Sequence, residues 1–302
     1  IHNFKMRPAV LLALLPAAQG IRIIHSNDDG WAELYTRSFN EALVAAGHDV
    51  VLSAPAENKS GTSSSDSEPA VRTSACQYNS CPANSNSPIG FNATNPRLNW
   101  VNSFPVTSMR YGIDTISPQF WNGEKPELAV AGPNVGSNLY IQVPFSGTVG
   151  SSAFAAKERK VPAIAFSGLS GGTSAWNTTP VPQRSLVYAQ LASKIVDAII
   201  NSGKPYLPED VFLNVNFPKV EGKCTDASNF KFVLSRINLG WFSAPDTKTC
   251  GSTRLPIDAS VVGTDGCYVS VSVGDANDKT TAPAEKQAVV LNKLKSLLTC
   301  LP

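Results

Sequence analysis

Apolar residues recur along the chain with two different periods, and these periods alternate. A short apolar run over residues 21–26 is followed by a segment with apolar residues at helical spacing: Tyr35, Phe39, Leu43 and Ala46. The next run, DVVLSAP over residues 49–55, has the length of a strand. A strand, a helix and a second strand in this order predict a βαβ unit with parallel strands and a right-handed crossover.

The same alternation continues toward the C-terminus. Residues 125–168 predict a strand, a Gly- and Asn-rich loop, a helix that begins near Ser146 to Gly150, and a further strand. Later segments predict an amphipathic helix over 181–203, strands over 211–217, 231–239 and 267–273, and a closing helix over 282–299. We therefore expect an α/β domain over 21–302, with a core over 21–218 and a C-terminal extension over 219–302 of strands or a hairpin and a helix.

One segment departs from this periodicity. Residues 70–120 are dense in Asn, Ser and Pro and have no clear period. Two cysteines, Cys76 and Cys81, lie within this segment, and we expect an ordered excursion that a disulfide holds in place.

The N-terminus carries a predicted export signal. Met6 and Arg7 precede PAVLLALLPAAQG, so a positive charge, an apolar stretch and small residues follow one another. This pattern predicts a signal peptide over residues 1–20, in which residues 1–5 are extraneous because they precede a start-like Met. The apolar stretch is shorter than the roughly 20 residues that span a bilayer. We expect a secreted protein without a membrane anchor.

Charge argues against two classes of partner. The chain has 25 Lys and Arg against 23 Asp and Glu, and removal of Lys5 and Arg7 with the signal peptide leaves 23 of each. Nucleic-acid polymers and anionic membranes are bound through clustered basic residues, and the sequence contains no basic run. Neither binding nucleic-acid polymers nor binding anionic membranes is therefore expected as the main task.

The six cysteines of an exported chain predict three disulfides. Six cysteines allow 15 connectivities. Sequence proximity favours Cys76–Cys81, Cys224–Cys250 and Cys267–Cys300. A cysteine metal site is disfavoured because the chain has no CxxC pair. Sequons predict N-glycosylation at Asn58, Asn92 and Asn177.

Two adjacent carboxylates follow the first predicted strand. Asp28 and Asp29 lie in the stretch SNDDG, directly after residues 21–26. Asp-Gly between apolar runs also favours a hairpin, but the helical spacing after Gly30 excludes one. Open α/β sheets bind ligands at the carboxyl ends of parallel strands. Two interpretations of the pair remain: a ligand site, and a solvated loop in which one Asp caps the helix.

Two further polar loops follow predicted strand ends. The segment over 54–69 is rich in hydroxyl side chains and contains Gly61. The loop FSGTVG precedes a predicted helix whose free N–H groups, together with the hydroxyls of Ser146 and Thr148, would bind an anion. Taken alone, a flexible linker and plain helix packing explain these loops as well. Three polar loops at three parallel strand ends favour a binding site.

The side chains of these loops predict a metal site. Two carboxylates this close repel each other unless a cation lies beside them. Asp28 and Asp29 would supply charge, Ser60 a hydroxyl and Asn134 an amide oxygen. An all-oxygen set suits Mg²⁺ or Mn²⁺, with Ca²⁺ as a further candidate, rather than Zn²⁺.

Four motifs in the same order and spacing carry a family resemblance. They are SNDDG, P-x-x-N-x-S-G at Pro55 to Gly61, PELAVAGPNVGSN and FSGTVG, and they resemble those of the SurE survival-protein phosphatases. The resemblance returns in LNVNFP (213–218) and TDGCYVSVSV (264–273). It implies a Rossmann-like, mostly parallel sheet and a metal-dependent phosphomonoesterase, or nucleotidase, acting on nucleoside monophosphates and other phosphate esters.

The resemblance also implies roles for individual residues. The implied metal ligands are Asp28, Asp29, Ser60 and Asn134. The implied catalytic residues are Asp28, Asp29, Asn134, Ser146 and Thr148. The implied substrate-binding residues are Asn58, Ser60, Gly61, Asn138, Ser146, Gly147 and Thr148.

The chain departs from the family pattern at several points. WAELYTRSF follows the double Asp where the family usually has a Pro-Gly. SFPVTS, over residues 103–108, stands in place of the family's GTPADC, and AGPN in place of its SGIN. The stretch between residues 62 and 125 is longer than in bacterial members. These changes resemble the secreted fungal-type acid phosphatase branch. Bacterial members use their C-terminal strands in dimers, and disulfides in this region would replace that support, so a monomer and a homodimer both remain open.

Two routes for the reaction are compatible with these residues. Either a water molecule or the carboxylate of Asp28 or Asp29 attacks phosphorus. A binding protein that keeps the loops without turnover is the alternative from another functional class. His25, in the first strand, is expected to be a packed strand residue rather than a catalytic one.

Overall fold

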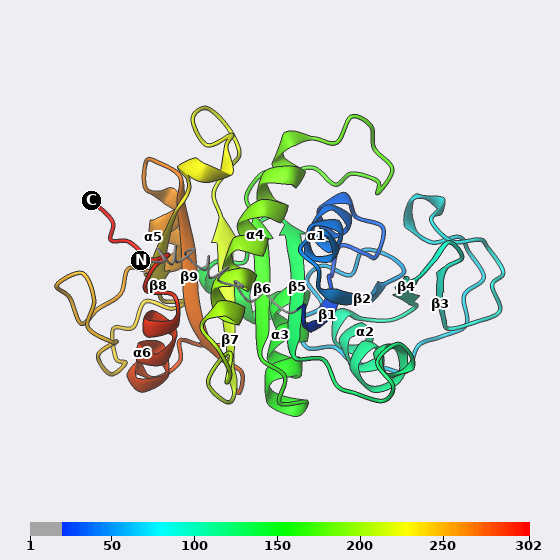
Figure 1. Ribbon diagram of the computed structural model, residues 1–302, viewed down its shortest axis with the longest axis horizontal. Helices are drawn as coiled ribbons and strands as arrows, with labels where there is room; N and C mark the ends of the chain where they lie inside the picture. Colours follow the sequence, from blue (N-terminus) through cyan, green and yellow to red (C-terminus); the bar gives the residue numbers. More distant parts are fainter. Residues whose placement is uncertain (1–19) are drawn as a thin grey trace, which may run out of the picture.

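A nine-stranded sheet forms the centre of the computed structural model, which describes residues 20–302 (Figure 1). The predicted signal peptide, apart from Gly20, lies outside the described residues. The strands are β1 (Arg22–Ser26), β2 (Asp49–Pro55), β3 (Ile89–Asn92), β4 (Asn95–Val101), β5 (Leu128–Val135), β6 (Ala163–Gly168), β7 (Val211–Phe217), β8 (Lys231–Ser235) and β9 (Tyr268–Asp275).

The strand order is β3-β4-β2-β1-β5-β6-β7-β9-β8. All neighbours from β4 to β7 pair in parallel, whereas β3 and β9 run antiparallel to β4 and β7. The chain moves from β1 to β2 on one side, and β5 lies on the other side of β1. The predicted α/β class with a mostly parallel sheet is confirmed.

Helices cover both faces of this sheet. They are α1 (Leu34–Ala45), α2 (Pro105–Tyr111), α3 (Gly147–Glu158), α4 (Gln183–Asn201), α5 (Asp258–Gly263) and α6 (Ala284–Lys293). Successive residues of a strand point to opposite faces. Ile23 accordingly packs with Phe39 of α1, and Ile24 packs with Met109 of α2. α4 joins the α1 side and lies in front of the sheet in Figure 1, while α3 joins the α2 side.

Short helical turns occupy several connections. They are η1 (Gln77–Asn79), η2 (Gly112–Ile116), η3 (Ser117–Gln119), η4 (Tyr140–Phe145) and η5 (Ala227–Asn229).

His25 of β1 is fully buried, and its ring nitrogen Nε2 lies 2.7 Å from the carbonyl oxygen of Gly132. The prediction that it is a packed strand residue is therefore confirmed.

The C-terminal extension differs in detail from the sequence prediction. β8 and β9 pair in parallel through a connection that contains α5, so they do not form a hairpin. β8 ends at Ser235 rather than at residue 239, because Arg236 pairs with Ile257 instead of continuing the ladder. The closing helix ends at Lys293 rather than at residue 299, because the chain then turns to run beside β8, where the Thr299 N–H donates to the Phe232 oxygen at 2.8 Å.

Two of the favoured disulfide pairings are wrong. Cys76–Cys81 is present, but the other four cysteines form Cys224–Cys267 and Cys250–Cys300. The sheet register explains the difference. The N–H of Lys231, at the start of β8, donates to the Cys267 oxygen. The pairing of β8 with β9 therefore places Cys267, rather than Cys250, beside the segment that precedes β8 and carries Cys224. Tertiary pairing thus overrides proximity in sequence.

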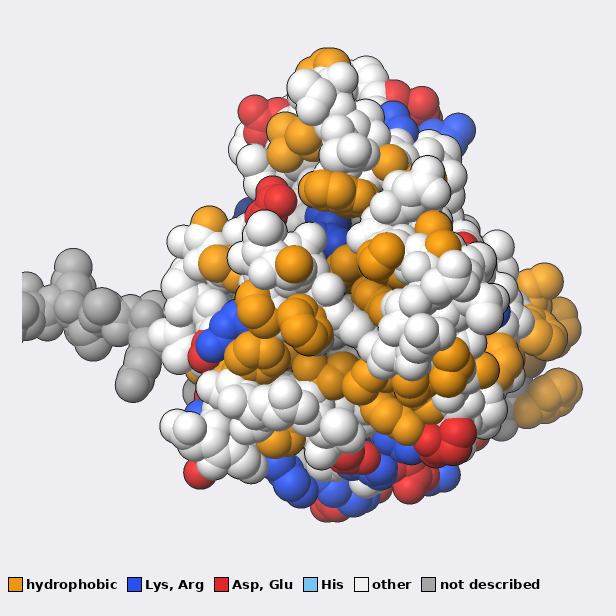
Figure 2. Space-filling model, turned by 90° about the vertical axis from the view of Figure 1, so that its right-hand side faces the viewer, with side chains coloured by type: hydrophobic (Ala, Val, Ile, Leu, Met, Phe, Trp, Pro, Cys, Tyr) orange, Lys and Arg blue, Asp and Glu red, His pale blue; other side chains and the backbone are white. Residues whose placement is uncertain are grey.

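The excursion between β2 and α2 is ordered, as predicted, and supplies β3 and β4 at one end of the sheet. Val71 and Phe91 of this segment are 56% and 61% exposed. Figure 2 views the molecule from this end and shows hydrophobic side chains distributed across the face. None of the helices in the described part of the chain combines the length and apolar character that crossing a bilayer requires.

Candidate active site

Polar loops converge where the strand order reverses. Asp28 and Asp29 follow β1, Asn134 lies near the end of the adjacent β5, and Ser60 follows β2 on the other side of β1. Crevices at such switch points are the usual ligand sites of open α/β sheets. The sequence placed these residues at strand ends, and the order of the strands brings the strand ends together.

Asp28 is held by the first turn of α3. Its side chain is buried, the Thr148 hydroxyl donates to Oδ1 at 2.6 Å, and the Thr148 N–H donates to Oδ2 at 3.2 Å. Gly147 permits this approach, since a Cβ there would lie 2.9 Å from the Asp28 Cβ and 2.8 Å from the Pro105 Cγ. Donors at a helix N-terminus stabilise the ionised carboxylate.

Asp29 is held by two other strand ends. The Ser60 hydroxyl donates to its Oδ1 at 3.2 Å, and the Asn58 amide donates to the same oxygen at 3.4 Å. The Val135 N–H, at the end of β5, donates to Oδ2 at 2.7 Å. Each carboxylate therefore has a fixed orientation set by a different part of the fold.

The electrostatic environment of the pair is unfavourable for two negative charges. Burial raises the pKa of the Asp28 carboxyl. Burial, followed by the Asp28 charge, raises the pKa of the Asp29 carboxyl well above its usual range. Among residues 20–302, no Lys, Arg or His forms an ion pair with either carboxylate. A bound cation would supply the missing compensation.

The donor set fits a hard divalent cation. No group of three or more His, Cys, Asp or Glu suited to a metal occurs in the described part of the chain, so oxygens of other residue types would complete the site. Asn134 donates its Nδ2 to the Gly136 oxygen at 2.8 Å, which leaves Oδ1 for a ligand. Carboxylate, hydroxyl and amide oxygens are ligands for Mg²⁺, Mn²⁺ and Ca²⁺.

A cavity of about 650 Å³ opens at this point. The predicted site residues that line it are Asp28, Ser60, Gly61, Asn134, Asn138 and Ser146. Asp29, Asn58, Gly147 and Thr148 do not line it, and they act on the site through contacts with its walls. The cavity is large enough for a nucleotide-sized ligand.

Ser146 and Thr148, which the sequence predicts as two anion-binding hydroxyls, make different contacts in the structure. The Ser146 hydroxyl accepts from the Val149 N–H at 3.1 Å, so Ser146 is the N-cap of α3. Thr148 is fully buried, and its hydroxyl contacts Asp28 rather than the cavity. The Thr148 side chain is thus neither the helix cap nor exposed to a ligand in this structure.

Asn138 is positioned by two residues that the sequence analysis did not select. Its N–H donates to the Asn216 Oδ1 at 2.8 Å, and its carbonyl oxygen accepts from the Asn214 amide at 2.9 Å. Its own side-chain amide donates to the Ser167 hydroxyl at 2.8 Å. Alternating Asn in the buried strand sequence VFLNVNF was the available signal, because buried polar side chains need partners.

η4 was not anticipated as part of the site. Its residues Ile141, Gln142 and Phe145 line the same cavity, although the sequence gives only a short loop between a strand and a helix.

Glu33, the residue before α1, is a further buried carboxyl group. It accepts hydrogen bonds from the Ser174 N–H and the Tyr78 hydroxyl, and burial raises its pKa to about 7.

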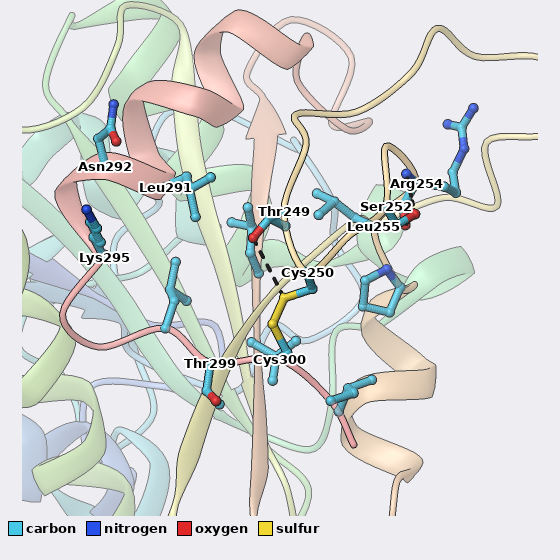
Figure 3. Close-up of a pocket in the computed structure, with 15 residues that line it drawn as sticks. Thr249, Cys250, Ser252, Arg254, Leu255, Leu291, Asn292, Lys295, Thr299 and Cys300 are labelled. Atoms are coloured by element: carbon cyan, nitrogen blue, oxygen red, sulfur yellow. Dashed lines mark hydrogen bonds between the residues drawn. A yellow bond between two sulfur atoms is a disulfide. The ribbon is translucent and has the colours of Figure 1, made fainter.

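A second cavity, of about 610 Å³, lies in the C-terminal extension. Figure 3 shows it between α6, which carries Leu291, and the loop that carries Thr249 and Leu255, with the Cys250–Cys300 disulfide beside them. Its described lining contains no Asp, Glu or His. This second cavity therefore offers no carboxylate or imidazole for acid–base or metal chemistry.

Comparisons with known proteins point to one family. The family model described as "Survival protein SurE" matches residues 23–231, which include every predicted site residue. An acid phosphatase from Yarrowia lipolytica is 31% identical over 301 residues, covering 90% of this chain and 84% of the relative. A 5'-nucleotidase SurE from Geobacter metallireducens is 29% identical over 198 residues, covering 66% of this chain and 65% of the relative.

A solved structure supports the fold. The crystal structure of the SurE protein from Aquifex aeolicus aligns with a TM-score of 0.58 at 22% identity, covering 84% of this chain and 93% of that one. At this level of identity the likeness extends to the fold alone. The α/β architecture therefore agrees with the family model that matches the sequence.

Proposed function

The chain belongs to the SurE family, and from this premise we propose that it is a secreted, divalent-metal-dependent phosphomonoesterase acting on nucleoside monophosphates and other small phosphate esters. Water cleaves the P–O bond of R–O–PO₃²⁻, giving the alcohol R–OH and inorganic phosphate. The observation that carries the proposal is the pair of adjacent buried carboxylates, Asp28, which lines the cavity, and Asp29 directly behind it in sequence, for which residues 20–302 supply no ion-pair partner.

Four residues would hold the cation: Asp28, Asp29, Ser60 and Asn134. Mg²⁺ or Mn²⁺ fits this oxygen set best. When bound, the ion neutralises charge on the phosphoryl group and lowers the barrier to attack at phosphorus. The raised pKa values of the two carboxylates support this assignment, because a nearby cation would favour their ionised forms.

The residues of the chain contribute orientation and charge. Thr148 fixes the plane of the Asp28 carboxylate, while Ser60 and the Val135 N–H fix that of Asp29. Gly61 and Asn138 line the cavity where the phosphate would bind. Holding these groups in place before the substrate arrives removes the cost of ordering them during reaction.

Either water or one of the two carboxylates is the nucleophile under this proposal. In an aspartyl route, the carboxylate of Asp28 or Asp29 displaces the alcohol R–OH from phosphorus and becomes an acyl-phosphate, which water then hydrolyses to the free carboxylate and inorganic phosphate. Acid quenching during turnover of a ³²P-labelled ester distinguishes the routes, since only the aspartyl route leaves label on the protein.

The exported state is part of the proposal. Three disulfides among the described residues and the signal-like sequence of residues 1–20 support an extracellular location. Secretion of the full chain from a eukaryotic host, with glycosylation assayed by deglycosylase treatment, is the corresponding test.

The activity is tested on protein stripped of metal with EDTA. We expect p-nitrophenyl phosphate and 5'-AMP to be hydrolysed only after Mg²⁺ or Mn²⁺ is restored, with bis(p-nitrophenyl) phosphate resistant. Full activity in EDTA would contradict the metal dependence. Binding of 5'-AMP with no turnover under any metal would contradict the enzyme assignment and favour a binding protein.

A further inference from the structure

Two apolar side chains of η4 line the candidate catalytic cavity, and we call them the apolar wall. Ile141 and Phe145 of η4 line the same cavity as Asp28 and Asn134, and their side chains are 67% and 66% exposed. The lining thus combines polar groups, which suit a phosphoryl group, with apolar side chains. Ligand sites of this kind bind molecules that have one charged and one apolar part.

The start of this wall is fastened by the C-terminal extension. Asp258, the first residue of α5, is fully buried, and its Oδ2 accepts from the Tyr140 N–H at 3.2 Å. Tyr140 has a φ of 46°, in the left-handed region that non-glycine residues rarely adopt. Such a conformation persists where surrounding contacts hold it, and Asp258 supplies one of these contacts.

The other end of the wall is fastened by a second residue of the extension. Lys279, between β9 and α6, points its ammonium at the Ser63 hydroxyl, 3.1 Å away, and the Pro144 oxygen, 3.4 Å away. Ser63 in turn donates its N–H to the Phe145 oxygen at 3.0 Å. Lys279 therefore links η4 to the loop that carries Ser60.

Both fastening residues lie beyond the part of the chain that matches the family model, which ends at residue 231. The chemistry and the fastening of the wall thus come from different parts of the sequence. We propose, on the basis of the proposed function, that η4 is the leaving-group wall: Ile141 and Phe145 select phosphate monoesters with an apolar, ring-containing leaving group, and Asp258 and Lys279 are positioning residues for it.

The selectivity is measured with two esters of primary alcohols, 2-phenylethyl phosphate and ethyl phosphate, whose leaving groups have similar intrinsic reactivity. The wild type should favour the phenylethyl ester in kcat/KM by about 10- to 100-fold, the range that small apolar contacts in a pocket provide. Phe145→Ala and Ile141→Ala should each reduce this ratio. Phe242→Ala is the matched control, because Phe242 is fully exposed on a loop of the extension and does not line the cavity.

The positioning residues are tested by the same ratio. Lys279→Met should raise KM for the phenylethyl ester and lower the ratio, as expected for lost substrate binding. Lys293→Met is its control, since Lys293 donates to the Ser202 hydroxyl and the Gly203 oxygen, at the end of α4 and away from η4. Asp258→Ala should lower the ratio, while Asp258→Asn should restore it because an amide oxygen still accepts from the Tyr140 N–H.

The outcomes separate the two proposals. Hydrolysis of both esters with a ratio near one, or a ratio unchanged in Phe145→Ala, would overturn the leaving-group wall and leave the phosphatase assignment intact. Hydrolysis of p-nitrophenyl phosphate and 5'-AMP but of neither ester would overturn the leaving-group wall alone, and hydrolysis of none of the four at any metal concentration would overturn both. If the melting temperature falls in Lys279→Met while the ratio of kcat/KM values is unchanged, Lys279 is purely structural. If a variant of the buried Asp258 fails to fold, Phe145→Ala still tests the proposal, because Phe145 is exposed.

Discussion

The Thr148 hydroxyl makes the shorter of the two hydrogen bonds from Thr148 to the Asp28 carboxylate, and its removal is the sharpest perturbation of the site. Thr148→Val replaces this hydroxyl by a methyl group of similar size. Oδ1 of Asp28 then loses a donor at 2.6 Å, while Oδ2 keeps the Thr148 N–H at 3.2 Å. Thr148→Ser keeps the hydroxyl and serves as the matched control.

The expected cost follows from the burial of both partners. Hydrogen bonds to ionised groups contribute about 1.5–3 kcal/mol, so the free energy of unfolding should fall by about this amount when Asp28 is ionised. A lost helix cap would cost about 1 kcal/mol, but Ser146 rather than Thr148 caps α3. We expect kcat to fall by around 10²-fold as well, since Asp28 loses its fixed orientation.

The pH dependence carries a definite sign. Burial raises the pKa of Asp28, and the Thr148 hydrogen bond opposes this by favouring the ionised form. A raised pKa in the folded state contributes stability that is present below the unfolded value and is lost as the pH rises through the folded value. The valine variant raises this pKa further, so its deficit relative to wild type should widen with increasing pH.

Urea unfolding in EDTA from pH 4 to pH 8, together with kcat for p-nitrophenyl phosphate at saturating Mg²⁺, measures both effects. We expect Thr148→Ser to behave like wild type in both assays. Equal unfolding free energies for the valine variant and wild type at pH 8, with an unchanged kcat, would refute the role assigned to this hydrogen bond.

Three further predictions concern the site, the disulfides and pH. Asp29→Asn should remove most phosphatase activity and the rise in melting temperature caused by Mn²⁺, without lowering the melting temperature in EDTA, because it removes a buried charge; near-full activity would contradict the metal site. Thiol titration under denaturing, non-reducing conditions should find no free thiol. The disulfides with sequence separations of 43 and 50 should each stabilise the folded protein by about 4 kcal/mol. Peptide mapping that joins Cys224 to Cys250 would contradict the fold of the extension. Burial raises the pKa of Glu33 from 4.5 to about 7, so its stabilising contribution should be lost as the pH rises between these values. Glu33→Gln should therefore flatten the fall in melting temperature over this pH range, and parallel curves of melting temperature against pH for variant and wild type would refute this.

The part of the fold that follows from local periodicity was predictable from the sequence. The alternation of residues 21–55 specified β1, α1 and β2, and parallel strands place their ends at one edge of a sheet. Asp28 and Asn134 come to line one cavity because β1 and β5 are neighbours in the folded sheet, which local periodicity does not specify. Side chains that directly follow strand ends were therefore the accessible part of the site.

The remainder depends on tertiary pairing that no local pattern encodes. Cys224 pairs with Cys267 because the register of β8 and β9 brings them together, although Cys250 is closer in sequence. Thr148 contacts Asp28 because the first turn of α3 lies beside the residues that follow β1, and Ser146 is the N-cap. Lys279 reaches η4 from a segment far along the chain, a contact that only the folded sheet defines.

The central claim is that a divalent cation held by Asp28, Asp29, Ser60 and Asn134 supports hydrolysis of phosphate monoesters. Titration of EDTA-stripped protein with Mn²⁺, with bound ion counted by electron paramagnetic resonance and p-nitrophenyl phosphate hydrolysis followed in the same samples, tests it most directly. Activity should rise in proportion to a single class of bound Mn²⁺, and the Asp28→Asn, Asp29→Asn double variant should lose both. Hydrolysis that proceeds without bound Mn²⁺, or that survives in the double variant, would contradict the claim.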